Sequence, residues 1–227
     1  MPNIRWGFIL QRNLKISCIF TERLVIIWVQ QRNRTQMGRP KLKEKNMSRL
    51  KAIDPSTATG KAKELLDAVK GKLGIVPNMT RVMATSPVVL ESYLGFSGAL
   101  SGGHLDAKTR EKLALLTAQE NSCDYCLSAH TAIGKMVGLK DEEIVASRQG
   151  NGNNPKTTAA LTFAKQVLDA KGQISEAELA VVRDAGFSDG EIAEIIAHVA
   201  LNVFTNYFNI AAGVDIDFPK VSHSEVA

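Results

Sequence analysis

A repeated pattern of helix start and stop signals is the feature that most constrains the fold of this chain. Over residues 54–212, capping residues precede stretches whose apolar side chains recur at helical spacing, and glycines or asparagines follow those stretches. Ser175 and Ser188 are each followed three positions later by glutamate, the pattern of a capping box. No strong run alternates apolar and polar residues as a half-buried strand does. The sequence therefore predicts an all-α fold, a compact helical bundle of roughly eight helices.

The same signals predict where individual helices begin and end. A first helix is expected to open at Asp54 and to stop at Gly71 or Gly74. Ser122 is expected to be the N-cap of a helix that ends at Gly138, which puts both cysteines that follow in the first turn. The other helices are expected over residues 78–85, 88–100, 106–119, 141–148 and 155–171, followed by two that begin at the capping boxes, the last running from 189 to about 212.

The basic character of the chain is confined to its beginning. The first fifty residues hold eleven of the 28 Lys and Arg but only two of the 23 Asp and Glu, so their formal charge is +9 and that of the rest is −4. The overall charge of +5 is therefore no argument for a nucleic-acid partner of the folded part. We interpret residues 1–46 as a basic extension, either disordered or the result of a start placed upstream of Met47, and residues 47–227 as the folded domain.

The compartment follows from the apolar runs and the cysteines. Residues 14–29 form the one apolar run that could mimic a signal or membrane segment, but Glu22 and Arg23 interrupt it and it is short for a span. Three cysteines are too few for a disulfide scaffold, and two of them are spaced Cys-x-x-Cys, as in redox or metal sites of reducing compartments. We expect a cytoplasmic protein with no membrane partner.

Two cysteines and one histidine lie within eight residues. On a helix, Cys126 and His130 are one turn apart on the same face, and Cys123 lies one turn before Cys126. A thiolate, not a thiol, attacks peroxides and disulfides, and a helix N-terminus together with a neighbouring imidazole helps a cysteine to ionise. The sequence therefore indicates an activated thiol pair.

Glu111 is the candidate partner of His130. If the two helices fold back at Asn121-Ser122, the two residues differ by two positions in their distance from the turn, which corresponds to roughly 3 Å along the helices. The carboxylate and the imidazole would then lie level across the hairpin. A carboxylate, imidazole and thiol relay is the arrangement that this count predicts.

Two other interpretations of the cysteine pair stay open. A structural zinc site would need four ligands, and the chain has no second Cys pair and only His104, His198 and His223 to spare. A buried structural pair with an incidental histidine is the other alternative, since free cysteines are often buried. We expect no metal. The sequence also has no phosphate-binding glycine loop, dinucleotide fingerprint or serine nucleophile elbow, so we expect no bound organic cofactor.

The last helix carries a second polar constellation. Glu191, Glu194, His198, Asn202 and either Asn206 or Asn209 follow one helical stripe, while isoleucines and valines follow another. The apolar stripe is expected in the core. For the polar stripe a solvated face is the default expectation, and lining of a pocket near Cys126 is the alternative.

The spacing Glu, eleven residues, Cys-x-x-Cys, three residues, His resembles the alkylhydroperoxidase D family within the carboxymuconolactone decarboxylase superfamily. The chain matches it at Glu111, Cys123, Cys126 and His130. The likeness extends over about residues 47–219 and is strongest to the peroxidase-related branch, through Val76-Pro77-Asn78-Met79 and the segment from Asn206 to Pro219.

This resemblance implies an all-helical, homo-oligomeric thiol peroxidase. Cys126 would be the peroxidatic cysteine, Cys123 the resolving cysteine, His130 the base and Glu111 the relay residue. Some members have a histidine just before the second cysteine where this chain has Tyr125, which makes Tyr125 a further relay candidate. The implied partners are a hydroperoxide substrate and an external dithiol reductant, thioredoxin-like or a lipoyl protein.

Two functions of other classes remain as alternatives. A non-enzymatic redox sensor or thiol-disulfide exchange helper would be oxidised once without turnover. A carboxymuconolactone decarboxylase-like lyase would act on a lactone acid, although decarboxylase members typically lack the Cys pair that is present here.

Overall fold

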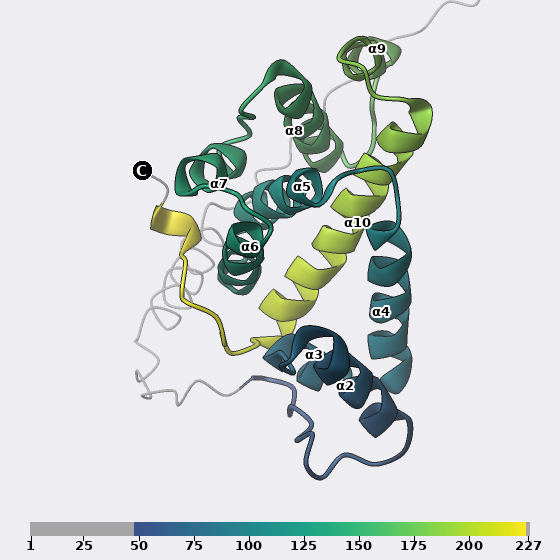
Figure 1. Ribbon diagram of the computed structural model, residues 1–227, viewed down its shortest axis with the longest axis vertical. Coiled ribbons are helices and arrows are strands. Elements are labelled where there is room, and N and C mark those ends of the chain that lie inside the picture. The colour runs from purple at the N-terminus through teal and green to yellow at the C-terminus, as the bar shows by residue number, and fades with distance from the viewer. Residues whose placement is uncertain (1–47, 226–227) are drawn as a thin grey trace, which may run out of the picture. The chain divides into compact units, whose positions relative to one another are not determined.

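The computed structural model describes residues 48–225, and within that range the chain forms nine α-helices and no strand (Figure 1). The all-α prediction is confirmed. The extension expected at residues 1–46 lies outside the described residues. The helices are α2 (Gly60–Leu73), α3 (Asn78–Met83), α4 (Pro87–Ser101), α5 (Ala107–Glu120), α6 (Asp124–Met136), α7 (Asp141–Arg148), α8 (Pro155–Asp169), α9 (Glu176–Asp184) and α10 (Asp189–Ala212), followed by a 3-10 turn at His223–Glu225.

The first of these helices begins later than the sequence suggested. Asp54 Oδ1 accepts hydrogen bonds from the backbone N–H and the hydroxyl of Ser56, at 2.9 and 2.8 Å. A short acidic side chain that binds the chain two residues on forms a local turn, which competes with a helix. The predicted opening at Asp54 is therefore wrong: α2 begins at Gly60 and ends at the left-handed Gly74.

The two capping boxes start α9 and α10 as predicted. Ser175 and Ser188 each accept a hydrogen bond from the backbone N–H three residues later, and the glutamate at that position binds back to the N-cap N–H. Each box satisfies two of the backbone donors that a helix start leaves without a partner. The start of α10, the longest described helix, is thus fixed by local sequence alone.

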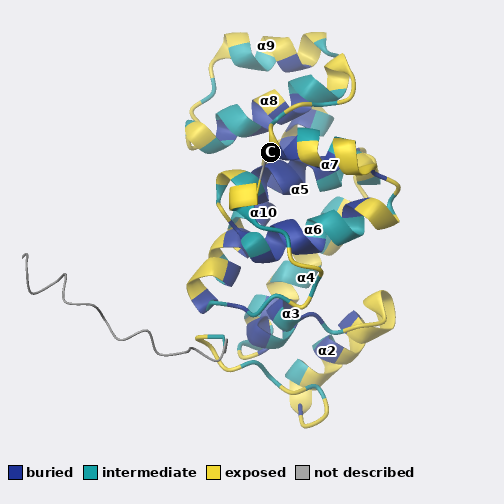
Figure 2. Ribbon diagram, turned by 90° about the vertical axis from the view of Figure 1, so that its left-hand side faces the viewer, coloured by how far each residue is buried: buried dark blue, intermediate teal, exposed yellow. Residues whose placement is uncertain are grey.

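α5 lies at the centre of the bundle, in contact with α6, α7, α8 and α10, and Figure 2 shows it largely in the colour of buried residues. Leu115 and Ala118 join a first core with residues of α2, α3, α4 and α6. Leu113 and Leu116 join a second core with residues of α8, α9 and α10. A helix enclosed by two cores has little freedom to shift. The α5 side chains that belong to neither core are therefore held in fixed positions.

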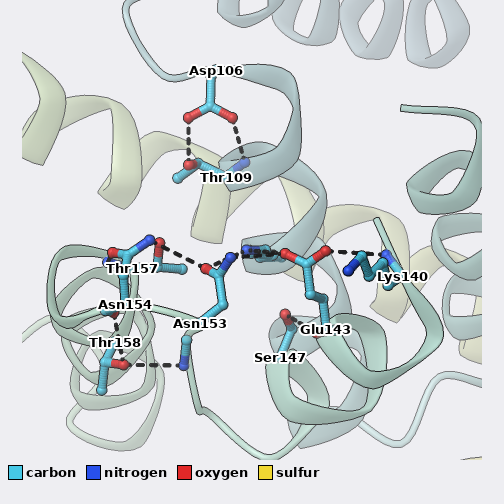
Figure 3. A network of polar contacts seen from close by, with 11 residues as sticks. Asp106, Thr109, Lys140, Glu143, Ser147, Asn153, Asn154, Thr157 and Thr158 are labelled. Carbon is cyan, nitrogen blue, oxygen red and sulfur yellow. Dashed lines mark hydrogen bonds and ion pairs between the residues drawn. The ribbon is translucent and has the colours of Figure 1, made fainter. Parts of the chain in front are cut away.

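A buried lysine ties α5 to α7 and to the loop before α8, through the Glu143 and Asn153 side chains that Figure 3 labels. Lys112 is 4% exposed, and its Nζ lies 3.1 Å from Glu143 Oε1 and 2.9 Å from Asn153 Oδ1. Glu143 also accepts hydrogen bonds from Asn153 Nδ2 and from the backbone N–H of Lys140. The buried charge is therefore paired and hydrogen-bonded, which is the condition under which a buried lysine is tolerated.

The chain after α10 runs back as an extended segment, here called the strap (residues 214–225). In Figure 1 it is the yellow segment that leaves α10 and passes α6. The backbone N–H of Val221 donates a hydrogen bond to the Ser128 hydroxyl, and Asp124 accepts hydrogen bonds from the backbone N–H and the ring of His223. Arg148 donates to the carbonyl of Ser222 at 2.8 Å. The strap is thus fastened beside the first turns of α6.

α10 is long and apolar, and half of its most apolar stretch is buried inside the protein. By length and composition it is the one described helix that would suit a membrane span, with a mean hydropathy of 1.3 over a window that is 50% buried inside the protein. Ile192, Ile195 and Val199 fill the second core. This is the pattern of a central helix in a packed domain.

Candidate redox site

The turn between α5 and α6 places the first cysteine at a helix start. Ser122 has a φ of 54°, its N–H binds the carbonyl of Gln119, and the N–H of Cys123 binds the carbonyl of Ala118. These two bonds around a left-handed residue form a Schellman motif, which closes α5. The prediction of Ser122 as N-cap is therefore wrong, because Ser122 ends α5 and Cys123 is the N-cap of α6.

The two cysteines lie in this first turn as free thiols. Cys123 Sγ accepts a hydrogen bond from the backbone N–H of Cys126 at 3.4 Å. Cys123 is 1% exposed and Cys126 is 2% exposed. Both sulfurs therefore lie at the positive end of the α6 dipole and away from bulk water.

Glu111 and His130 meet across the hairpin. Glu111 Oε2 lies 2.7 Å from His130 Nδ1, and the side chains are 16% and 22% exposed. Burial by itself would lower the pKa of His130, but the charge and the hydrogen bond of Glu111 outweigh it, and the pKa of His130 is raised. The carboxylate and imidazole that the residue count placed level with each other are in contact.

The two thiols differ sharply in acidity. The pKa of Cys126 is lowered to about 6, chiefly because the Cys123 thiol donates a hydrogen bond to its thiolate; burial opposes the shift, and the charge of His130 and the amides of Asn209 and Asn206 support it. The pKa of Cys123 is raised, since it holds that proton and is itself buried. Cys126 is therefore the more acidic thiol of the pair.

Asn209 lies outside the cysteine motif, and it was expected only as one of two possible ends of the polar stripe, with a pocket near Cys126 as the alternative to a solvated face. Its Nδ2 donates to Cys126 Sγ and to Met79 Sδ, both at 3.2 Å. It belongs to the polar stripe of α10, for which a solvated face was the default expectation. That expectation is wrong for the C-terminal four members, which are all at most 6% exposed: His198, Asn202, Asn206 and Asn209. The run of amides at helical spacing in an otherwise apolar helix is visible in the sequence, but it does not say whether the amides face water or the core.

The two glutamates of the same stripe lie apart from the cysteines. Glu191 completes the capping box with Ser188. Glu194 accepts hydrogen bonds from the backbone N–H groups of His104 and Leu105, at 2.8 and 2.9 Å. These contacts hold the start of α10 and the loop between α4 and α5, so both carboxylates are structural.

The Tyr125 side chain is held by contacts with α3 and with the strap. Its hydroxyl accepts a hydrogen bond from the backbone N–H of Met79 at 3.1 Å, and its ring packs edge-on against Phe218 at 5.8 Å between centroids. Burial raises the pKa of Tyr125, with the nearby Asp217 charge adding to the effect. These contacts join α6 to α3 and to the strap, and the relay role expected for Tyr125 stays a prediction.

Tyr93 of α4 is a second residue near the site that the motif did not reveal. The pKa of Tyr93 is raised to about 12, chiefly by burial and then by the charges of Cys126 and Glu111, while a hydrogen bond to Ser97 opposes the shift. Its phenol therefore stays protonated beside the thiolate. A lone tyrosine in an apolar helix carries no sequence signal that distinguishes it from a core residue.

The remaining histidines do not join the cysteines. His104 is exposed, and His223 pairs with Asp124 at 2.7 Å. Burial and the charge of Arg110 lower the pKa of His198, and His198 Nε2 has no hydrogen-bond partner. Within residues 48–225, no three His, Cys, Asp or Glu side chains are grouped as metal ligands would be.

Comparison with known proteins gives a family match and several structural likenesses. Residues 87–166, which run from α4 into α8, match the model of the carboxymuconolactone decarboxylase family. A solved alkylhydroperoxidase AhpD core, an uncharacterized peroxidase-related protein from Ralstonia eutropha, is 25% identical with a TM-score of 0.69, covering 75% of this chain and 92% of that one. A search of curated proteins found no match.

Two further solved structures are similar in fold. An uncharacterized peroxidase-related protein from a Silicibacter species is 24% identical with a TM-score of 0.66, covering 77% of this chain and 94% of that one. A debrominase is 18% identical with a TM-score of 0.64, covering 78% and 94%. At the level of the family these likenesses support a peroxidase-related role, and the debrominase shows that proteins of this fold differ in their named activities.

Proposed function

The chain is an alkylhydroperoxidase D-like member of the carboxymuconolactone decarboxylase superfamily, and from that premise we propose that it is a thiol-dependent peroxidase that cycles through a Cys123–Cys126 disulfide. The observation that carries the proposal is the asymmetry of the two thiols. Cys126 has a pKa lowered to about 6, whereas the pKa of Cys123 is raised. One thiolate and one neighbouring thiol are what such a cycle needs.

The first step is attack by the Cys126 thiolate on the distal oxygen of a hydroperoxide. His130, whose imidazolium form is supported by Glu111, has taken the Cys126 proton. A sulfur–oxygen bond forms and the oxygen–oxygen bond breaks, which gives a sulfenic acid on Cys126. The oxygen that leaves takes the proton from His130 and departs as an alcohol, or as water when the substrate is hydrogen peroxide.

The second step forms the disulfide. The Cys123 thiol attacks the Cys126 sulfenic sulfur, the sulfur–sulfur bond forms, and hydroxide leaves with the Cys123 proton as water. Two electrons have then passed from the two thiols to the peroxide. An external dithiol, thioredoxin-like or on a lipoyl protein, returns them by thiol-disulfide exchange. Because this cycle requires a reducing compartment, we propose a cytoplasmic location.

The test compares single serine variants after one addition of cumene hydroperoxide. In the Cys123→Ser protein, the sulfenic acid on Cys126 should persist and be trapped by dimedone, because the resolving thiol is missing. In the Cys126→Ser protein no sulfenic acid should form. Trapping in Cys126→Ser but not in Cys123→Ser would reverse the roles, and no reaction of the unaltered protein with any hydroperoxide would refute the peroxidase.

The burial of both sulfurs favours one alternative, a non-enzymatic redox sensor or thiol-disulfide exchange helper. A sensor would be oxidised once, and a partner would read the change. Continuous hydroperoxide consumption with a thioredoxin-like or lipoyl dithiol separates the two: many turnovers per Cys pair support the enzyme. Consumption that stops at one equivalent supports the sensor.

A further inference from the structure

Two asparagine amides on α10 lie beside the Cys126 sulfur, and each has a buried polar atom without a partner. Asn206 is fully buried and Asn209 is 3% exposed. Asn206 Nδ2 and Asn209 Oδ1 have no hydrogen-bond partner. Buried polar groups in folded proteins are almost always paired, so unpartnered ones beside a reactive group indicate that something else binds there.

The orientation of the Asn206 amide is fixed by a neighbour. Asn121, at the end of α5, donates its Nδ2 to Asn206 Oδ1 at 2.9 Å. With the oxygen engaged, the Nδ2 of Asn206 is the free end of the amide. The same amide also helps to lower the pKa of the Cys126 thiol, which places it beside that sulfur.

The Asn209 amide is oriented by two sulfurs. Its Nδ2 donates to Cys126 Sγ and to Met79 Sδ, each at 3.2 Å, so both of its N–H groups are used. The two terminal atoms of an amide are roughly 2.3 Å apart from standard bond lengths, so Asn209 Oδ1 lies within about 5.5 Å of the Cys126 sulfur. The site therefore holds a free acceptor as well as a free donor.

We propose that Asn206 and Asn209 form the subsite that binds the hydroperoxide group, with the Asn209 oxygen accepting from the peroxide O–H and the Asn206 N–H donating to the oxygen that carries the organic group. A hydroperoxide offers one donor, on its distal oxygen, and acceptor lone pairs on both oxygens. The two unpartnered atoms match that pattern. This inference rests on the proposed peroxidase function and names the residues that recognise its substrate.

The subsite acts on the step in which the oxygen–oxygen bond breaks. As the Cys126 thiolate bonds to the distal oxygen, negative charge develops on the oxygen that leaves, before the His130 proton reaches it. The Asn206 N–H stabilises that charge as an oxyanion-hole donor does, because it is already oriented in a buried, water-poor site. The Asn209 oxygen keeps the distal oxygen turned toward the sulfur.

The experiment measures two rate constants for the full chain, with the pH held at about 8, where the Cys126 thiolate is formed. One is for oxidation by cumene hydroperoxide. The other is for alkylation by iodoethane, which attacks the same thiolate but has no hydrogen-bonding group. Asn206→Leu keeps the size of the side chain and removes its donor, so the peroxide rate should fall about 100-fold while the iodoethane rate stays within about threefold.

Two more variants guard against a folding effect. Asn206→Ala leaves room for a water molecule that can replace the donor, and should recover part of the peroxide rate. Asn202→Ala is a matched control one turn away on the same buried stripe, where the amide donates to the carbonyl of His198, and should leave both rates unchanged.

The outcomes separate this inference from the proposed function. Equal loss of both rates in Asn206→Leu, or no loss of either, overturns the subsite while leaving the peroxidase intact. An unaltered protein that reacts with iodoethane but with no hydroperoxide overturns both. A selective loss of the peroxide rate in the Asn206 variants supports the subsite.

Discussion

At the scale of single residues, the site depends on the different hydrogen-bond partners of the two cysteine sulfurs. Cys123 caps α6 with its sulfur, so that sulfur is bound by the Cys126 N–H and the thiol of Cys123 serves Cys126 as a donor. Cys126 is surrounded by the Cys123 thiol, the His130 charge and the Asn209 amide. The same side chain is therefore a thiol at one position and a thiolate three residues later.

A first prediction concerns the pH dependence of Cys126. Its pKa is lowered to about 6, so the thiolate is formed above that pH and is lost as the pH falls through it. In a Cys123→Ser background the serine hydroxyl can still donate, and alkylation by iodoethane should be constant above about pH 7 and fall about tenfold per unit below about 6.

The Glu111→Gln variant tests whether the Glu111–His130 pair contributes to the lowered pKa of Cys126. It removes the charge that raises the pKa of His130, so at neutral pH His130 becomes less cationic and supports the Cys126 thiolate less. The alkylation midpoint should move to higher pH. An unchanged midpoint would mean that the Glu111–His130 pair does not control the thiolate.

At the scale of elements, the close turn between α5 and α6 decides where the site lies. Ser122 takes the left-handed conformation that usually belongs to glycine, with a φ of 54°. This allows Cys123 to end the Schellman motif of α5 and to cap α6 at once. A longer connection would move His130 along α6 relative to Glu111.

A second prediction follows for Ser122→Gly. Glycine adopts a positive φ without the steric cost that a serine side chain brings, so the variant should be more stable by about 1 kcal/mol, measured by urea unfolding. Ser175→Gly is the matched control, since Ser175 is an N-cap in the extended region and its loss should destabilise by a few tenths. A loss of stability in both would contradict the strain at Ser122.

Two neighbouring residues of α5 have different roles, one at the redox site and one in a buried ion pair. Glu111 points to the redox site, and Lys112, the next residue, is buried against Glu143 and Asn153 on the side of α7.

A third prediction is that Lys112→Met costs about 3 kcal/mol in unfolding free energy, because Glu143 keeps its charge without its main partner. The double variant with Glu143→Gln should recover part of the loss, and a single variant as stable as the original would refute the role of the pair.

At the scale of the whole molecule, the strap is fastened beside the first turns of α6, and we expect it to limit access to the thiols. Val221 packs against the core that contains both cysteines, and His223 is bound to Asp124, which lies between them in the sequence.

A fourth prediction is that a chain ending at Pro219 reacts faster with a bulky aromatic disulfide reagent. Arg148→Gln, which removes one anchor of the strap, should have a smaller effect in the same direction. Equal rates in all three proteins would show that the strap does not cover the thiols.

The outer face of α10 gives the fifth prediction, which concerns assembly. Four large apolar side chains lie on one side of that helix and are 38–59% exposed: Ile196, Phe204, Tyr207 and Ile210. Because contiguous exposed apolar side chains mark association surfaces, we propose that the chain forms a homo-oligomer through this face. Tyr207→Glu with Ile210→Glu should lower the molar mass measured by light scattering, and Leu73→Glu on α2, also exposed, should not. A single mass for all three proteins equal to that of one chain would refute the oligomer.

The sequence by itself determined the helical class, most helix ends, and the spacing that brings Glu111 to His130. These depend on local rules: capping boxes, glycine stops and the rise per residue of two helices joined by a short turn. The cysteine motif was equally visible, because its members lie within one segment. The position of Ser122 in the turn was misjudged because its left-handed conformation belongs to the end of α5, not to the start of α6.

Only the tertiary structure decided which distant side chains complete the site. Asn209 is 83 positions from Cys126 in the chain, and its amide reaches the sulfur because α10 packs against α5 and α6. Nothing local distinguishes a polar stripe that faces water from one that faces a buried thiolate. Burial is a property of the packed molecule, and it is the packing of α10 that places the Asn206 and Asn209 amides in the interior beside Cys126.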